Sequence, residues 1–143
     1  MREDVPSGGS PVRRDPPAGA VEGRAHGVIA RFLGIPFAEA PVGDLRFAAP
    51  VSRKRWTDVR SAVTFGPTMA QPHRDFTLIP EPEEEGEDTL HLNVFAPSDL
   101  PATNMPVLVY IHGGGFFSGC NRSPWFDGAP FVENGVLVVT PAY

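Results

Sequence analysis

One stretch of the sequence constrains the fold more than any other, because an apolar run leads directly into a histidine and three glycines. Residues 106–111 are apolar, and residues 112–115 read His-Gly-Gly-Gly. A continuous apolar run is typical of a β-strand covered on both faces. Glycine after such a strand gives up packing and costs conformational entropy, so it is useful where main-chain N–H groups must approach another group closely. The run therefore predicts a site built from backbone atoms at the end of a buried strand.

The segments around this strand alternate between predicted strands, loops and one short helix. Runs of valine and isoleucine indicate strands, and prolines and glycines rule out long regular elements between them. This order predicts an α/β sheet. The expected strands cover residues 19–23, 28–35, 90–96, 106–111 and 136–140, the expected loops cover 66–88 and 113–128, and a helical turn is expected over 129–134 with Gly135 after its end.

The chain is long enough for one ordinary domain with a core. It has 143 residues, of which 41% are hydrophobic and 20% are charged. Its start is rich in proline, glycine, serine and charge, which predicts a mobile tail over residues 1–18 and a domain over 19–143. Cys120 is the only cysteine, so no internal disulfide can form. With no apolar segment near the N-terminus, this favours a reducing, cytoplasmic location.

The acidity of the chain is concentrated in one segment. The net charge is −5, and residues 81–88 hold six acidic side chains, so the rest of the chain carries +1. We expect this segment to be a solvated loop rather than a metal site. No basic stripe points to nucleic acid, and no apolar segment approaches the roughly 20 residues that span a bilayer. The histidines lack metal-ligand spacing, so no metal or cofactor is expected.

Three separate segments resemble, in the correct order, the signatures of the type-B carboxylesterases. Residues 32–47 resemble F-x-G-I-P-Y-A-x-P-P-x-G-x-L-R-F, residues 87–94 resemble E-D-C-L-x-L-N-V, and residues 112–119 resemble H-G-G-G-F-x-x-G. The resemblance extends over residues 19–143. This family includes carboxylesterases, cholinesterases and non-catalytic relatives such as the neuroligins.

The resemblance implies an incomplete α/β-hydrolase fold. The chain would supply its N-terminal part, which consists of a small N-terminal β-sheet and the first strands of the central sheet. In that fold the strand before His112 pairs with a later strand, which carries the nucleophile. Without that neighbour an apolar central strand becomes an exposed edge, which invites aggregation. We therefore expect the isolated chain to be poorly soluble or partly molten.

The glycine run has a defined role in the resemblance. An HGGG-type motif supplies the oxyanion hole of lipases and esterases, where backbone N–H groups stabilise the negative oxygen of the acyl-transfer intermediate. The resemblance assigns these N–H groups to Gly114 and Gly115, with Gly113 as a further residue of the loop. The substrate of the complete protein would be a small carboxylic ester.

Three other residues in the matching segments are expected to be structural. The base of the family comes much later in the chain, so His112 is expected to brace the loop by hydrogen bonding rather than to act as the base. The resemblance also implies a salt bridge between Arg46 and Glu87, because each lies in a family motif.

The main departure from the family pattern is the absence of a nucleophile. No G-x-S-x-G occurs in the 143 residues. The triad serine, acid and histidine would follow Tyr143, so the isolated chain is expected to be inactive. The alternative is a non-catalytic binding or adhesion-type relative, or a truncated pseudo-enzyme. The intact glycine run argues mildly against that alternative, because a protein without activity has no need of it.

The sequence assigns no function to Cys120 or to four aromatic residues near the glycine run. Cys120 has no nearby base in the sequence and is expected to be an inert thiol. Four aromatic residues near the glycine run could line a substrate pocket or pack in the core equally well: Phe116, Phe117, Trp125 and Phe126.

Overall fold

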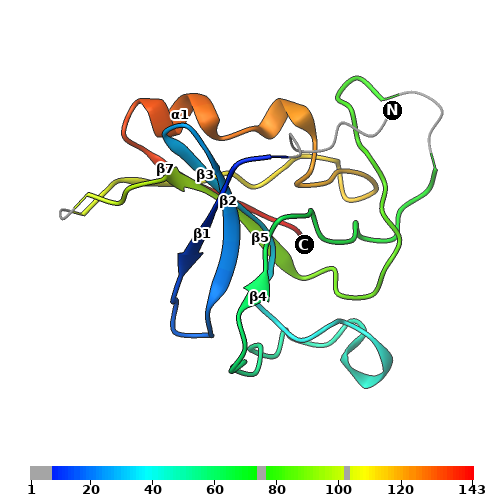
Figure 1. The fold of residues 1–143 in the computed structure, drawn as a ribbon. Helices are drawn as coiled ribbons and strands as arrows, with labels where there is room; N and C mark the ends of the chain where they lie inside the picture. Colours follow the sequence, from blue (N-terminus) through cyan, green and yellow to red (C-terminus); the bar gives the residue numbers. More distant parts are fainter. Residues whose placement is uncertain (1–7, 74–76, 102–103) are drawn as a thin grey trace.

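The computed structural model describes residues 8–73, 77–101 and 104–143, and a single mixed β-sheet forms its centre (Figure 1). Within these residues the strands lie in the order β1-β2-β3-β5-β7-β6, and β4 pairs with β2. Neighbours from β1 to β7 are antiparallel, whereas β6 is parallel to β7. The elements are β1 (Ser10–Arg14), β2 (Val21–His26), β3 (Ile29–Pro36), η1 (Gly43–Leu45), β4 (Arg60–Ser61), β5 (His91–Pro97), β6 (Val107–Val109), η2 (Pro124–Phe126), α1 (Ala129–Glu133) and β7 (Leu137–Pro141).

The first strand lies inside the stretch that was expected to be a mobile tail. β1 pairs with β2 over its whole length, from Ser10 opposite Ala25 to Arg14 opposite Val21. Val12 packs against a buried cluster of the sheet. The expected tail is therefore wrong for these residues, because one inward-facing valine and a full ladder outweigh the composition of the segment. Residues 1–7 lie outside the described part of the chain.

The sheet is covered on both faces by small apolar clusters. Successive residues of β3 point to opposite faces, so Ala30 and Phe32 pack in one cluster while Ile29 packs in the other. The second cluster also contains Val132 of α1, the short helix that Figure 1 shows lying along this face of the sheet. Ala30 is completely buried. The strands expected from the apolar patterns at 28–35, 90–96 and 136–140 are confirmed within a residue or two.

The helical turn expected before Gly135 is also confirmed. The N–H of Gly135 donates to Val132 O at 2.9 Å, and the N–H of Val136 donates to Phe131 O at 3.0 Å. Gly135 has φ +79°, the left-handed conformation that this pair of bonds requires. Such a C-terminal motif favours glycine, which stops α1 and turns the chain into β7.

The strand that leads to the glycine run is an edge strand here. β6 has β7 on one side and no partner on the other among the described residues. Val107 and Val109 are 57% and 55% exposed, and Ile111 is also exposed. The sequence predicted a strand covered on both faces, and this is wrong for the chain by itself. The exposed edge that the resemblance implied is confirmed, since burial of this strand requires a neighbour that these residues do not provide.

Candidate active site

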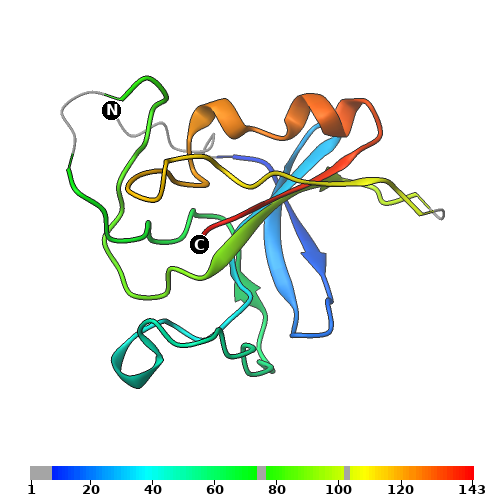
Figure 2. The same ribbon diagram turned by 180° about the vertical axis from the view of Figure 1, so that it is seen from behind.

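The candidate site is the glycine loop, defined here as residues 112–119, which follows β6 and reverses the chain. Figure 2 shows it in yellow to orange, running from β6 toward α1. The N–H groups of Phe117 and Ser118 both donate to Gly114 O, at 3.2 and 3.1 Å. These bonds close a tight turn, and the turn leaves Phe116 in the left-handed region with φ +67°. The glycine loop therefore has a defined backbone conformation.

The three glycines of the run are not equivalent. Gly114 has φ +150°, and a Cβ at this position would overlap the carbonyl oxygen of Ser118. Gly115 has φ +63°, and its Cβ would lie 2.8 Å from Cε1 of Phe117. A Cβ on Gly113 would meet nothing within 4 Å. Glycine is thus required by close approach at Gly114 and by backbone conformation at Gly115, whereas Gly113 has room for a side chain.

Successive main-chain donors of the loop, among them those of Gly114 and Gly115, have no acceptor among the described residues. The N–H groups of Gly113, Gly114, Gly115 and Phe116 donate no hydrogen bond within that part of the chain. Most main-chain N–H groups in a folded protein are paired, with protein or with water. Unpaired N–H groups on successive residues can bind an oxygen that carries negative charge.

His112 is buried and contacts both ends of the glycine loop. Its Nδ1 lies 2.9 Å from Gly113 O, which makes Nδ1 the protonated nitrogen because a carbonyl only accepts. The ring also lies against Gly119, where an added Cβ would be 2.6 Å from Nδ1. Tyr143 stacks on the imidazole at 4.5 Å and donates its hydroxyl to His112 O at 2.5 Å. These contacts keep the imidazole against its own loop.

A buried polar network holds the chain just after the glycine loop. Asn93 of β5 donates from Nδ2 to Asn121 O at 3.0 Å and to Thr140 Oγ1 at 3.2 Å. Asn121 donates from Nδ2 to Thr140 O at 2.9 Å. The same Asn93 accepts from the N–H of Gly34 at 3.0 Å, at the bulge of β3. All three side chains are buried, and such satisfied networks fix one arrangement.

The sequence analysis did not select this network as part of the site. The available signal was a polar asparagine on the inward side of an apolar strand, since a buried amide needs partners. Its partners, Asn121 and Thr140, are far apart in the sequence, and their meeting depends on the order of β5 and β7.

The salt bridge expected between Arg46 and Glu87 is not present in the described part of the chain. Both side chains are exposed, and the Arg46 guanidinium lies 5.0 Å from the centre of the Phe47 ring. Arg46 follows η1 on an outward turn, so it faces solvent instead of the second motif. The expected pair is therefore wrong for this structure.

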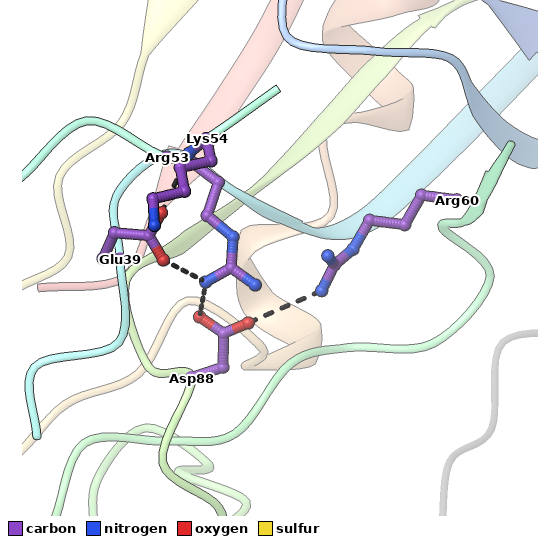
Figure 3. Close-up of polar contacts among 5 residues, drawn as sticks. All are labelled: Glu39, Arg53, Lys54, Arg60 and Asp88. Atoms are coloured by element: carbon purple, nitrogen blue, oxygen red, sulfur yellow. Dashed lines mark hydrogen bonds and ion pairs between the residues drawn. The ribbon is translucent and has the colours of Figure 1, made fainter. Parts of the chain in front are cut away.

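Neighbouring residues of the same two motifs make ionic contacts instead (Figure 3). Asp88 contacts Arg53 at 3.3 Å and Arg60 at 3.5 Å, while Glu39 contacts Arg53 at 3.4 Å. Glu39 also accepts from the N–H of Lys54 at 2.9 Å. The cluster is partly exposed, so each pair contributes modestly, and it joins the segment after β3 to the start of β5. We regard it as structural.

Burial shifts the pKa of two ionisable side chains near the site. Cys120 is buried, which raises the pKa of its thiol, so the protonated thiol dominates. His91 of β5 is also buried, which lowers its pKa and favours the neutral ring, while its Nε2 lies 2.9 Å from Pro67 O.

Within the described part of the chain no group of three His, Cys, Asp or Glu side chains could hold a metal ion. No helix there is long and apolar enough to cross a membrane.

The aromatic residues near the glycine loop divide into two groups. Phe116 is fully exposed and Trp125 is mostly exposed, so core packing does not account for either in this chain. Phe117 is half exposed. Phe126 packs against Tyr110 with ring centres 4.8 Å apart. The exposed rings remain candidates for a substrate pocket.

The sheet, its glycine loop and the family signatures together define a class of protein. The model of the carboxylesterase family matches residues 12–143, so this chain belongs to the carboxylesterase family. The match begins within β1, earlier than the boundary at residue 19 that the sequence predicted.

Individual relatives support this assignment. The chain is 41% identical over 127 residues to the para-nitrobenzyl esterase of Bacillus subtilis, covering 87% of this chain and 26% of that protein. It is 38% identical over 128 residues to a fumonisin B1 esterase of Sphingopyxis macrogoltabida, covering 88% of this chain and 23% of that protein. The chain therefore spans about a quarter of the length of these relatives.

Solved structures confirm the fold. A PNB esterase structure superimposes with a TM-score of 0.84 and 38% sequence identity, covering 92% of this chain and 27% of the other. The Geobacillus stearothermophilus carboxylesterase EST55 gives a TM-score of 0.80 at 35% identity, covering 92% and 26%. Since these enzymes have an α/β-hydrolase fold, the chain forms the N-terminal part of that fold, as the resemblance implied.

Proposed function

We propose that this chain supplies the oxyanion-hole loop of a serine carboxylic-ester hydrolase that acts on small carboxylic esters. The observation that carries the proposal is a run of main-chain N–H groups without an acceptor among the described residues, in which Gly114 and Gly115 have conformations that require glycine. Membership of the carboxylesterase family supports the same reaction class. A cytoplasmic location stays a prediction from the sequence.

The proposed chemistry follows from charge development on the ester. Attack by a serine hydroxyl converts the carbonyl oxygen into an oxyanion, and donors aimed at that position stabilise the transition state more than the ground state. Gly114 and Gly115 would each donate an N–H, and the resemblance places a third donor on the residue after the serine. Loss of one such donor costs about 3 kcal/mol of transition-state stabilisation, or roughly a hundredfold in rate.

The surrounding contacts would keep these donors in place before substrate arrives. His112 and Tyr143 hold the start of the glycine loop, and the buried network at Asn121 holds its exit. Donors held in this way need no reorganisation during the reaction, which is the source of their catalytic effect. In this proposal His112 fixes the loop and takes no proton from the nucleophile.

The isolated chain is proposed to be inactive. Its 143 residues contain no G-x-S-x-G segment, and a loop that binds the oxyanion cannot attack the ester. We expect hydrolysis of p-nitrophenyl esters by this chain alone to stay at the background rate. Turnover that survives purification and scales with protein concentration would contradict this part of the proposal.

A chimera tests the proposed function. Residues 12–143 would replace the matching N-terminal part of the Bacillus subtilis para-nitrobenzyl esterase, and hydrolysis of a p-nitrophenyl ester would be measured. Gly114→Ala should lower kcat/KM about a hundredfold, because its Cβ displaces the turn that carries the donors. Gly113→Ala, whose Cβ faces open space, should lose much less. Equal losses for the two variants, with unchanged circular dichroism, would count against the proposal.

The non-catalytic alternative makes a different prediction. A binding or adhesion-type relative needs the sheet but not the unpaired donors. A labelled phosphonate ester reacts only with an activated serine, so labelling of a full-length product that contains this segment supports the hydrolase. Absence of labelling in a folded full-length product favours the alternative.

A further inference from the structure

Hydrogen bonds join Thr68 to Glu84, which belongs to the acidic segment (residues 81–88) near the glycine loop. Thr68 donates from its N–H at 2.9 Å and from Oγ1 at 3.1 Å to Glu84 O, and Glu84 N–H donates to Thr68 Oγ1 at 2.9 Å. The preceding Pro67 O accepts from the buried ring of His91 on β5. The backbone of Glu84 is therefore fixed to the sheet, although the surrounding segment looks like a solvated acidic loop in the sequence.

The side chain of Glu84 contacts the chain that leaves the glycine loop. Its Oε2 lies 3.1 Å from Nη1 of Arg122, the residue after the buried Asn121. The Arg122 side chain is only 19% exposed, and its guanidinium lies 5.5 Å from the centre of the Phe65 ring. The Glu84 side chain is 58% exposed, so the pair lies at the surface, and the mostly buried arginine limits its geometry.

A second contact reaches the turn itself. Ser118 Oγ lies 3.4 Å from Oε1 of Glu81 and donates toward it. Ser118 is also the residue whose N–H bonds Gly114 O and whose carbonyl leaves no room for a Cβ on Gly114. Figures 1 and 2 both show the green acidic segment at the same end of the molecule as the glycine loop.

We propose that Glu84 and Arg122 are positioning residues for the glycine loop, with Glu81 and Ser118 as a weaker second link. The hydrogen bonds between Thr68 and Glu84 fix the backbone of Glu84 relative to the sheet. The ion pair between Glu84 and Arg122 then restrains the segment that ends the glycine loop. The acidic segment thereby sets the orientation of the Gly114 and Gly115 N–H groups. The catalytic consequence rests on the proposed function, whereas the structural constraint does not.

Amide hydrogen exchange in the chimera tests the constraint directly. The N–H groups of Phe117 and Ser118 are protected by Gly114 O, so their exchange rates report opening of the turn. Arg122→Met should raise both rates about tenfold, and Glu84→Gln should have a similar effect. Arg24→Met, which breaks the pair with Glu22 at the same N–O distance of 3.1 Å, is the matched control and should leave both rates unchanged.

Protected amides of β5 and β7 show whether each variant keeps its fold. Unchanged exchange at Phe117 and Ser118 in Arg122→Met overturns the proposal. Absence of protection in the wild-type turn overturns it as well, because nothing would then be held in place. If exchange is faster throughout the sheet of Arg122→Met, that variant has lost its fold and Glu84→Gln decides instead, because it keeps the backbone bonds to Thr68. Unchanged exchange at Phe117 and Ser118 in Glu84→Gln then overturns the proposal.

Kinetics of the chimera test the catalytic consequence. Arg122→Met should lower kcat about tenfold with little change in KM, because misplaced oxyanion donors affect the transition state more than the bound ester. Arg122→Lys should recover part of the loss, and Arg24→Met should match the wild type. An equal kcat in Arg122→Met and wild type overturns this consequence. If Gly114→Ala has no effect but turn exchange still accelerates in Arg122→Met, then the proposed function fails while the structural constraint stands.

Discussion

In the middle of the sheet, on β3, Ala30 and Phe32 are almost completely buried, whereas at the β6 edge Val107 and Val109 expose more than half of their surface. The middle strands are antiparallel and have apolar clusters on both faces. Among the described residues β6 has one parallel neighbour and no partner on its other side. The glycine loop follows β6, so polar and aromatic contacts at His112 and Asn121 define its shape more than burial of β6 does.

The largest expected effect comes from a cavity in the buried middle of the sheet. Phe32→Ala removes a ring that is 3% exposed and should lower the free energy of unfolding by about 3–5 kcal/mol. Val109→Ala, at the β6 edge, should cost under about 1 kcal/mol. Urea denaturation of the chain measures both, and similar losses would remove the contrast between the middle of the sheet and its β6 edge.

The next effect concerns the polar network that links β5, β7 and the chain after the glycine loop. Asn93→Leu leaves Asn121 O, Thr140 Oγ1 and the Gly34 N–H without their partner. Each unsatisfied buried group costs about 1–3 kcal/mol, so a loss of about 3 kcal/mol, the low end for three groups, is expected after relaxation. Denaturant midpoints should show it. An unchanged midpoint would indicate that water replaces the asparagine and that the network adds little.

A smaller effect is expected from the buried ring of His91. Burial lowers its pKa below the ordinary value of 6.5, so below that pH the unfolded chain binds a proton that the folded chain does not. Stability should therefore fall as pH drops below about 6.5, with a slope of at most about 1.4 kcal/mol per pH unit. His91→Gln should flatten this dependence in denaturation series between pH 7.5 and 5.5, while the exposed His73→Gln should keep it. The same slope in both variants would contradict the assignment.

The smallest change in stability, under about 0.5 kcal/mol, is expected from Val109→Lys, because the side chain lies on the exposed edge. Its effect should be on association instead. A charged residue on an edge strand opposes pairing with another edge, so light scattering should show less self-association than in the wild type. Wild-type chain that stays monomeric at high concentration with a sharp thermal transition would show that the open edge is harmless.

Local patterns predicted much of the sheet, because alternation and turn residues act over short distances. The strand over 90–96 and the helical turn ended by Gly135 follow from such patterns. β1 was missed because its composition resembles a disordered tail, although the ladder to β2 is local in space. The burial of β6 was wrong because coverage of a strand depends on distant partners.

The candidate site shows the same division. The conformational demands of Gly114 and Gly115 agree with the glycine pattern read from the sequence. The sequence did not show which of two adjacent carboxylates makes ionic contacts: a pair of Glu87 with Arg46 was expected, whereas Asp88 contacts Arg53 and Arg60. The network around Asn93 required the strand order, which the sequence alone does not provide.

The hydrogen bonds between Thr68 and Glu84 have a consequence for sequence variation. Because these bonds fix both ends, the chain between them can change in length without moving Glu84. The entropic cost of a longer loop is small, about 0.6 kcal/mol for each doubling of its length. Insertions between these residues would therefore be tolerated better than insertions in the glycine loop. Sequence variation is therefore expected between Thr68 and Glu84 more than in the glycine loop.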